Sequence, residues 1–480
     1  MLKGALFHFR KPGSQLFQRP SGCEQLFEDG GASESLGGVL LDAAVKDRGF
    51  DPWGFELRRF RPHLLKPFAR ISGKFHPISV GHRSPWECSV PAIRALDKLS
   101  EMLASSENFI QRMHQSGSYP NTIKQLERLF LPSEAADMVG RDRTTLARAE
   151  AELGLESPQR NPANNRRLGY TLAQIQEFRR HFGTLPWRDS ELDMPLVIAC
   201  QNFKGGVGKS TTCVNLAHYL ALKGYRVLVV DTDSQATTTQ SFGYMPDADI
   251  KQEETLLPYL DGTETSLAYS VRKTYWPNID LVPSCLALYE AEMAIAAHLA
   301  TQADKEQRVA FFSELKFGIQ TVSEHYDVVL VDSPPALGLI SINVLLAADC
   351  LLVPTAPRMP DFTSTVQFFR MMLDYISRID PSKEYRWMSV LTTLYVDGFS
   401  SHKQFVEVMR TCFSDGVFQH VFFHTTEILN TAVQFLGPYE RKKPNREVLT
   451  MLDGVFDEIE LRILREWPSK RAALLQKGIA

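Results

Sequence analysis

The sequence predicts a doubly wound, mainly parallel α/β domain over residues 195–467, preceded by a small α-helical domain. Beyond residue 195, apolar runs of strand length alternate with amphipathic helical stretches. A compact block of polar and apolar residues fills 131–183, and the proline-containing stretch 184–194 is a linker candidate. Alternating strands and helices are typical of parallel sheets covered on both faces. With 480 residues, the chain is also too long for one core.

Six apolar runs are the strand candidates of the α/β domain, and no internal repeat interrupts them. They are Leu196–Asn202, Arg226–Asp231, Ile279–Val282, Tyr326–Asp332, Cys350–Pro354 and Trp387–Leu394. Helical patterns cover Thr212–Lys223 and Glu447–Trp467, and a basic tail follows at 468–480.

The composition is that of an ordinary globular protein, with 44% hydrophobic and 23% charged residues. No stretch approaches the roughly 20 apolar residues of a membrane helix, and the N-terminus lacks the apolar core of a secretory signal. A net charge of −3 argues against a wholly basic nucleic-acid coat. Seven scattered cysteines without a C-x-x-C pair indicate reduced thiols in a cytosolic protein.

Residues 1–90 show no sustained periodicity, although a basic, aromatic stretch runs from Leu57 to Phe75. Two interpretations stay open: a nucleic-acid-binding arm, or a disordered extension whose start codon is assigned too far upstream. From 91 to 130 the pattern is helical, with Leu96, Leu99 and Leu103 at three- and four-residue spacing. Such a helix could serve dimerisation or simple packing.

A glycine-rich loop, Phe203–Thr211, follows the first strand candidate and leads into a helix. Glycines let backbone N–H groups converge on phosphate oxygens, and the helix N-terminus favours anions. Lys209 can reach terminal phosphates, and the Ser210 hydroxyl can ligate Mg²⁺. The sequence therefore predicts a site for ATP and Mg²⁺, whose ATP-binding residues are Lys204, Gly205, Gly206, Val207, Gly208, Lys209, Ser210 and Thr211.

Carboxylates end two further strand candidates. Asp231 and Asp233 follow one strand, and Asp332 ends the fully apolar run Val328–Val331. Ligands of open α/β sheets bind at the carboxyl ends of the strands. A carboxylate at Asp332 can hold a magnesium-bound water beside a phosphate site.

The second lysine of the loop, Lys204, stands where a simple phosphate loop accepts any residue. The loop thereby resembles the deviant Walker A motif of the ParA and MinD ATPases, a match that continues from Pro195 to about Leu436. The resemblance implies an ATP-sandwiched homodimer in which Lys204 reaches the partner's nucleotide. It implies catalytic roles for Lys204, Lys209 and Asp233, the last orienting water, and metal contacts through Ser210, Asp231 and Asp332. Ser234 departs from the family's usual proline.

Residues Ser133–Leu146 have the pattern of two short helices around a glycine turn, with Asp142 as a cap. Groove-facing candidates are Arg143, Thr144, Thr145 and Arg148, and a wing would carry Arg166 and Arg167. This block, residues 131–183, resembles the MerR-like winged helix-turn-helix domain of the larger, type Ia partition ATPases. A plain helical packing domain is the alternative interpretation.

Near the C-terminus, Lys442 and Lys443 belong to a basic cluster. In the family such residues bind DNA non-specifically, although a solvated charged surface explains the cluster equally well. The amphipathic helix Glu447–Trp467 carries several acids, which favours packing on the α/β domain over an anionic membrane surface.

The resemblance implies a cytoplasmic, nucleoid-associated bacterial protein that hydrolyses ATP to segregate plasmid or chromosomal DNA. Its implied partners are a second copy, operator and non-specific DNA, and a ParB-type centromere-binding protein, with no membrane. Repression of its own operator would use the helix-turn-helix. The alternative is a transcriptional repressor whose nucleotide site is only a switch.

Overall fold

The computed structural model describes residues 94–115, 124–301, 311–433, 435–476 and 478. All of them belong to one unit, 91–480. The predicted N-terminal extension, 1–90, lies outside the described residues.

The N-terminal helices begin with α1 (Ala95–Gln115), which confirms only part of the helical prediction for 91–130. Residues 124–129 form neither helix nor strand, and Phe130 pairs as an isolated antiparallel bridge with Tyr170. Three short helices follow: α2 (Pro132–Val139), α3 (Arg143–Glu152) and α4 (Leu172–Phe182). Residues 124–183 are called the N-terminal helical unit below.

The turn between α2 and α3 is set by two residues. Gly140 adopts φ 71°, a left-handed conformation that glycine reaches without a Cβ penalty. Asp142 then caps α3, because its carboxylate accepts the backbone N–H groups of Thr144 and Thr145 at 2.9 and 3.0 Å. The predicted cap and turn are therefore both present.

The α/β domain is built on a seven-stranded sheet of order β3-β4-β2-β5-β1-β6-β7, in which only β3 runs antiparallel. All six predicted strands are found, most of them a residue or two shorter than predicted. The two-residue β3 was not predicted. The strands are β1 (Leu196–Cys200), β2 (Val227–Asp231), β3 (Arg272–Lys273), β4 (Ile279–Val282), β5 (Val328–Asp332), β6 (Cys350–Thr355) and β7 (Trp387–Thr392).

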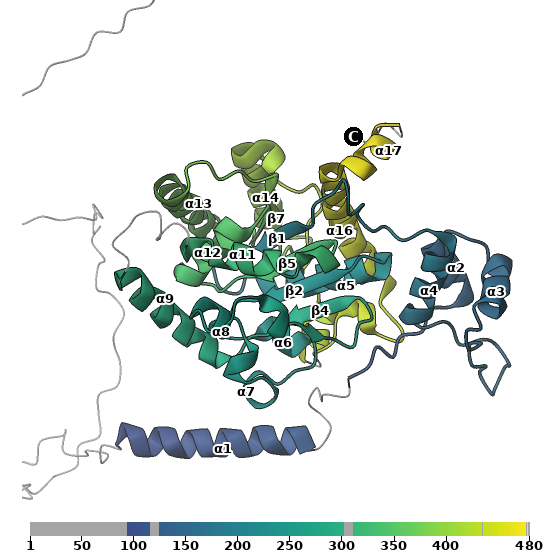
Figure 1. Cartoon of the computed structure of the whole chain (residues 1–480), viewed down its shortest axis with the longest axis horizontal. Helices are drawn as coiled ribbons and strands as arrows, with labels where there is room; N and C mark the ends of the chain where they lie inside the picture. The colour runs from purple at the N-terminus through teal and green to yellow at the C-terminus, as the bar shows by residue number, and fades with distance from the viewer. Residues whose placement is uncertain (1–93, 116–123, 302–310, 434, 477, 479–480) are drawn as a thin grey trace, which may run out of the picture. The chain divides into compact units, whose positions relative to one another are not determined.

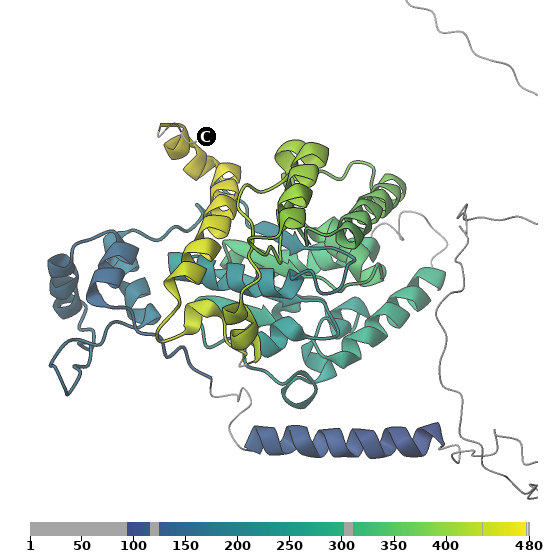
Figure 2. The same ribbon diagram turned by 180° about the vertical axis from the view of Figure 1, so that it is seen from behind.

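Helices cover both faces of this sheet, as Figures 1 and 2 show. Leu196, Ile198 and Cys200 of β1 belong to one core cluster, and the alternate residues Val197 and Ala199 to the other. This is the pattern of a sheet buried on both sides. The helices are α5 (Lys209–Lys223), α6 (Thr237–Ser241), α7 (Pro246–Asp249), α8 (Leu257–Leu260), α9 (Tyr289–Thr301), α11 (Glu314–Gln320), α12 (Leu339–Ala347), α13 (Met359–Ile379), α14 (Ser400–Phe413), α15 (Thr426–Val433), α16 (Arg446–Glu466) and α17 (Pro468–Gln476).

Helix α16 packs on the α/β domain, as its acidic residues predicted. Its buried side chains include Leu452, Phe456 and Ile459. Its acids also face protein partners: Tyr225 donates a hydrogen bond to Glu460 at 2.8 Å, and the ammonium of Lys223 lies 3.1 Å from Asp457. Among the described residues, no helix is long and apolar enough to cross a membrane.

Candidate active site

The glycine loop joins β1 to α5, and the Asn202 side chain just before it fixes its start to β6. Gly206 and Gly208 take φ 72° and 87°, which favours glycine at both positions. The Asn202 amide donates to the carbonyl of Pro354 at 2.8 Å, and its oxygen accepts the Lys204 N–H at 3.1 Å. These two bonds join the start of the loop to β6.

Lys209 is the buried cation of the loop. Its ammonium donates to the Lys204 carbonyl at 3.3 Å. Burial lowers the pKa of Lys209, while the negative charges of Asp332 and Asp233 act in the opposite direction. These two carboxylates therefore lie near the ammonium group, as the sequence predicted for a phosphate site. The Lys204 side chain is half-buried.

Asp231 holds the loop that follows β2. One carboxylate oxygen accepts both the N–H and the hydroxyl of Thr239, at 2.8 and 2.7 Å, and the other accepts the Asp233 N–H at 3.2 Å. Burial, followed by the negative charge of Asp332, raises the pKa of Asp231 well above its ordinary value. Its oxygens are thus engaged in shaping the loop, a role that the sequence did not reveal.

Asp332 presents a free carboxylate oxygen. Its Oδ2 accepts the Thr238 hydroxyl at 2.7 Å, while Oδ1 is buried and accepts no hydrogen bond from the described residues. Burial raises the pKa of Asp332, and the nearby hydroxyl of Ser210 lowers it. An orphaned oxygen beside a serine hydroxyl is a donor set that Mg²⁺ accepts. The residues present therefore fit this ion.

Asp233 lies in the loop between β2 and α6 and is mostly buried. Burial raises its pKa, whereas the Gln235 N–H, donated at 3.0 Å, and the charge of Lys209 lower it. The Ser284 hydroxyl donates to the Asp233 carbonyl at 2.8 Å and so supports the loop from the end of β4. Ser234, which replaces the family's proline, is half-buried and leaves this arrangement intact.

A small apolar pocket of about 70 Å³ opens beside the loop. It is bordered by Gly208 and Thr212 on the phosphate side and by Leu394, Phe422 and Ile428 on the other. No sequence pattern indicated this pocket, because its walls come from segments far apart in the chain. The pocket offers an apolar surface next to a phosphate-binding loop.

Comparisons with known proteins agree with this geometry. A family model described as an AAA domain matches residues 196–381. Protein SopA of Escherichia coli (strain K12) is 33% identical over 353 residues, which cover 71% of this chain and 90% of SopA. The chain belongs to the ParA-type partition ATPases. A putative replication protein A of Rhizobium rhizogenes is 30% identical over 398 residues, covering 79% of this chain and 97% of that protein.

The fold of this ParA-type chain is also that of a solved structure entitled "Partition Protein". The two are 19% identical, with a TM-score of 0.52, and the match covers 77% of this chain and 99% of the other. At this level of identity the likeness shows the fold alone. The conclusion that this chain is a partition ATPase depends on SopA and the other sequence relatives.

The predicted DNA-contacting residues of the ParA-type chain differ in their availability. Arg143, Thr144 and Arg148 of α3 are exposed. The Thr145 hydroxyl instead donates to Asp142 at 2.5 Å, which makes it part of the helix cap. Of the four predicted side chains on α3, those of Arg143, Thr144 and Arg148 are therefore the ones available to a groove.

The predicted wing is a short antiparallel hairpin. Arg160 and Arg167 form its bridge pair, and Arg166 is exposed near its tip. The Arg167 guanidinium lies 2.9 Å from the buried carboxylate of Glu150, which also accepts the Tyr170 hydroxyl at 2.7 Å. Arg167 therefore joins the wing to α3.

The basic cluster lies beside the N-terminal helical unit. Lys442 pairs with Glu127 at 2.7 Å, and Lys443 is exposed. Both line a groove of about 1020 Å³ that also includes Leu131 and Ser133 at the start of α2. The groove carries acids as well as bases, so its charge alone does not mark it as a DNA site.

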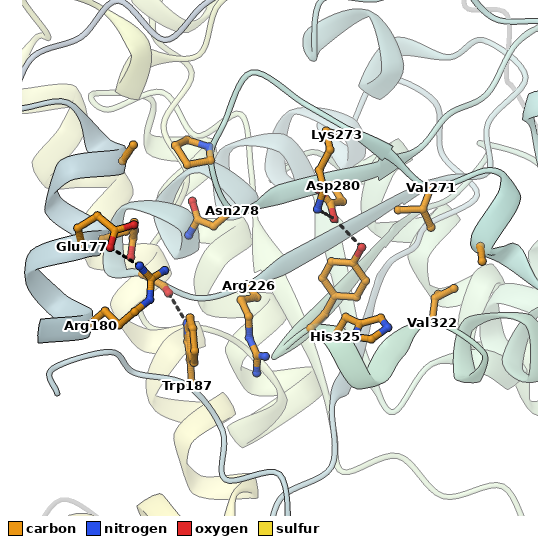
Figure 3. Close-up of a pocket in the computed structure, with 16 residues that line it drawn as sticks. Glu177, Arg180, Trp187, Arg226, Val271, Lys273, Asn278, Asp280, Val322 and His325 are labelled. Carbon is orange, nitrogen blue, oxygen red and sulfur yellow. Dashed lines mark hydrogen bonds and ion pairs between the residues drawn. The ribbon is translucent and has the colours of Figure 1, made fainter.

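A second pocket, of about 610 Å³, lies between α4 and the starts of β2 and β4 (Figure 3). Its charged groups pair with one another: Arg180 with Glu177, and Lys273 with Asp280. The Trp187 ring donates its N–H to the Gly224 carbonyl at 3.0 Å. The pocket marks where the N-terminal helical unit meets the α/β domain, at the edge opposite the nucleotide loop.

Proposed function

We propose that this chain is an ATP-hydrolysing DNA partition protein that dimerises on ATP and represses its own operator. The observation that carries the proposal is the convergence of Lys209, Asp233 and Asp332 on one glycine loop whose first lysine is Lys204. These groups supply what phosphoryl transfer to water requires: a cradle for phosphates, positive charge and an oriented nucleophile.

Each residue of the site has a proposed task. Backbone N–H groups of Gly205–Thr211 hold the phosphates, and Lys209 places its charge on the terminal ones. Asp233 orients the attacking water and accepts its hydrogen bond. Burial raises the pKa of Asp233, and a carboxylate with a higher pKa is a better proton acceptor near neutral pH.

Magnesium would be held by Ser210 and Asp332, with Asp231 contributing through water. When bound, the ion supplies positive charge to the phosphate oxygens. Asp231 and Asp332 also gain from a neighbouring cation, because each raises the cost of ionising the other. Thr238 and Thr239 keep the two carboxylates in their orientations.

Dimerisation is proposed at two places. Lys204 would reach the nucleotide of the second copy, and α1 would pair with its counterpart. Leu96, Leu99, Leu103 and Ile110 of α1 follow a seven-residue repeat and are 78, 61, 59 and 43% exposed. An apolar seam of this spacing is typical of paired helices.

DNA binding is proposed for two surfaces. Operator DNA would meet the helix-turn-helix through Arg143, Thr144 and Arg148, with Arg166 of the wing along the backbone. Non-specific DNA would meet Lys442 and Lys443 in the ATP form. A ParB-type partner would stimulate hydrolysis, and the protein would act in the cytoplasm on the nucleoid.

The experiment that tests the proposal is ATP turnover by wild type and Asp233→Ala, with and without DNA and the product of the neighbouring gene. Slow turnover that rises with both additions, and disappears in the variant, supports a partition ATPase. Wild-type binding of ATP and DNA without any turnover would reject the proposal. The alternative, a nucleotide-switched repressor, predicts that result together with nucleotide-dependent operator binding.

A further inference from the structure

The N-terminal helical unit is attached to the α/β domain at two helix ends. The Arg179 guanidinium donates to the Leu222 carbonyl near the end of α5 at 2.7 Å. The Lys124 ammonium donates to the carbonyl of Ser241, the last residue of α6, at 3.0 Å. Both helices lead away from the nucleotide site, so each attachment connects that site to the N-terminal helical unit.

The attachment to α5 is a fixed one. Helix α5 starts at Lys209 in the glycine loop. That loop is held by Asn202, which bonds to a carbonyl of β6, and by the Thr393 hydroxyl, which donates to the Val207 carbonyl at 2.7 Å. Burial lowers the pKa of Arg179 only to about 10, so it remains a cation at neutral pH. A cation at a helix C-terminus is favourable.

The attachment to α6 can move with the nucleotide. The first turn of α6 contains Thr238 and Thr239, whose hydroxyls hold Asp332 and Asp231 at 2.7 Å each. A cation bound between these carboxylates would draw on the same oxygens to which the two threonines donate, and so would act on the start of α6. Helix α6 has only five residues, so a shift at its start reaches Ser241 directly.

Lys124 is held firmly at the far end of α6. Its Cδ lies 3.1 Å from where a Cβ would stand on Gly243, its ammonium lies 4.4 Å from the centre of the Tyr275 ring, and Glu440 is 3.6 Å away. Glu440 is buried, and it also accepts the Tyr275 hydroxyl and the Gly437 N–H. Removing either charge alone would leave the other buried and unpaired.

The contacts continue from Lys124 toward α2. Four residues later, Arg128 donates to the Tyr439 carbonyl at 2.8 Å and pairs with Glu134 of α2. Arg128 is almost fully buried. Lys124 and Arg128 thus hold the first residues of the N-terminal helical unit against the turn Pro438–Glu440.

We infer that Lys124 is a positioning residue that couples the state of the nucleotide site to the orientation of the DNA-binding unit, through its bond to the end of α6. This inference rests on the proposed function, since it concerns operator binding by residues 131–183. By linkage, operator DNA then changes nucleotide affinity by the same factor as nucleotide changes operator affinity.

The test measures operator affinity with ADP and with a non-hydrolysable ATP analogue, for wild type and Lys124→Met/Glu440→Gln. The double change removes both buried charges together and keeps side-chain volume. We expect wild type to show a ratio within the ~5–150-fold range of allosteric couplings, and the double variant to fall to about one. Lys223→Met, which loses an ion pair between α5 and α16, is the control and keeps the wild-type ratio.

Tyr275→Phe provides a second, milder variant, because it keeps the ring under Lys124 and removes its hydroxyl from Glu440 and from the Ser241 carbonyl. Its ratio should lie between those of wild type and the double variant, with thermal unfolding confirming that it folds. A wild-type ratio that survives in both folded variants would overturn the inference alone. A wild-type ratio of one would reject the proposed nucleotide-dependent operator binding, and the inference with it.

Discussion

Asp231 and Asp332 are register partners on the neighbouring strands β2 and β5, and both side chains are completely buried. The fold therefore disfavours the charged form of each carboxyl until a cation arrives. Burial raises the pKa of both carboxyls, so the folded protein holds protons that the unfolded chain releases.

This pair makes the nucleotide-free protein sensitive to pH. Both carboxyls have a higher pKa in the folded protein than in the unfolded chain. Their protonated forms therefore contribute to the free energy of unfolding below the unfolded pKa, and this contribution is lost as pH rises through the folded pKa values. Asp332→Asn keeps the acceptor for Thr238 and removes one charge. We expect it to raise the free energy of unfolding at pH 8 by about 1–2 kcal/mol, with a smaller effect near pH 4.5, and to abolish turnover. Urea unfolding at pH 8 and pH 4.5 measures the change in the free energy of unfolding. An equal change at the two pH values would contradict the prediction.

Asn202 should be the main anchor of the glycine loop. Asn202→Ala removes the bonds to Pro354 and Lys204 and leaves buried backbone groups unpaired, which costs about 1–3 kcal/mol. We expect weaker ATP binding as well, measured by calorimetry. Thr365→Val removes one acceptor of the same amide, 3.0 Å away, and should lose less in both measurements. Unchanged ATP affinity in Asn202→Ala would show that phosphate itself shapes the loop.

Glu292 should stabilise the loop after β5 from the neighbouring helix α9. Its carboxylate accepts the N–H groups of Leu339 and Ile340, at 2.7 and 3.1 Å, at the start of α12. A Cβ on Gly338 would overlap the Glu292 carboxylate. Gly338→Ala should therefore displace this cap and lower the free energy of unfolding by about 0.5–2 kcal/mol.

A double-mutant cycle tests whether displacement of the Glu292 cap causes the loss of stability in Gly338→Ala. In the Glu292→Ala background, Gly338→Ala should cost little, because the cap is already absent. Gly416→Ala, whose Cβ would meet only ordinary contacts at 3.8 Å or more, serves as the control glycine. Additive losses at Gly338 and Glu292 would mean that the two act separately.

The apolar seam of α1 should support self-association. Leu99→Glu/Leu103→Glu places two charges in the seam, and we expect at least a tenfold weaker dimer, about 1.4 kcal/mol or more. Sedimentation over a range of protein concentrations measures the dissociation constant. Ser105→Glu/Asn108→Glu adds the same charge on the outer face of α1 and should leave it unchanged. Equal effects of the two double substitutions on the dissociation constant would exclude the apolar seam of α1 as a dimer contact.

The two DNA surfaces should separate by mutation. Arg143→Gln/Arg148→Gln should weaken operator binding by about 1–3 kcal/mol for each arginine that reads a base, with little change in non-specific binding by the ATP form. Lys443→Gln should weaken non-specific binding by the ATP form, with little change in operator binding. It should also reduce the slope of log K against log salt by about 0.9. Filter binding at several salt concentrations measures both, and parallel losses in both modes would argue for one shared surface.

Much of this architecture could be predicted from the sequence because it is local. Apolar runs located the strands, and the loop Phe203–Thr211 was recognisable because its glycines and lysines are consecutive. The helix prediction for 91–130 was too long, since apolar spacing does not register where Phe130 leaves helical geometry to pair with Tyr170. The edge strand β3 is short and polar and has no apolar pattern to reveal it.

The supporting contacts could not be predicted because they join residues that only the fold brings together. Thr238 and Thr239 look like ordinary polar residues of a short helix, and nothing in their spacing ties them to Asp332 and Asp231. Likewise, Lys124 precedes the α/β domain in the sequence, whereas Glu440 lies near that domain's C-terminal end. Arg167 and Thr145 were predicted to contact DNA, and the structure adds for each a protein contact that no spacing indicates: Arg167 with Glu150, and Thr145 with Asp142.

The attachment of Arg179 to α5 gives the N-terminal helical unit a pivot. Helix α5 has 15 residues and is therefore about 22 Å long, so the pivot stands well away from the phosphates. In a dimer, two recognition helices must match half-sites about 34 Å apart. A rotation of each unit about Arg179 would change the distance between the two recognition helices. An operator with a fixed half-site spacing would then bind the nucleotide state in which that distance matches, and would bind the other state poorly.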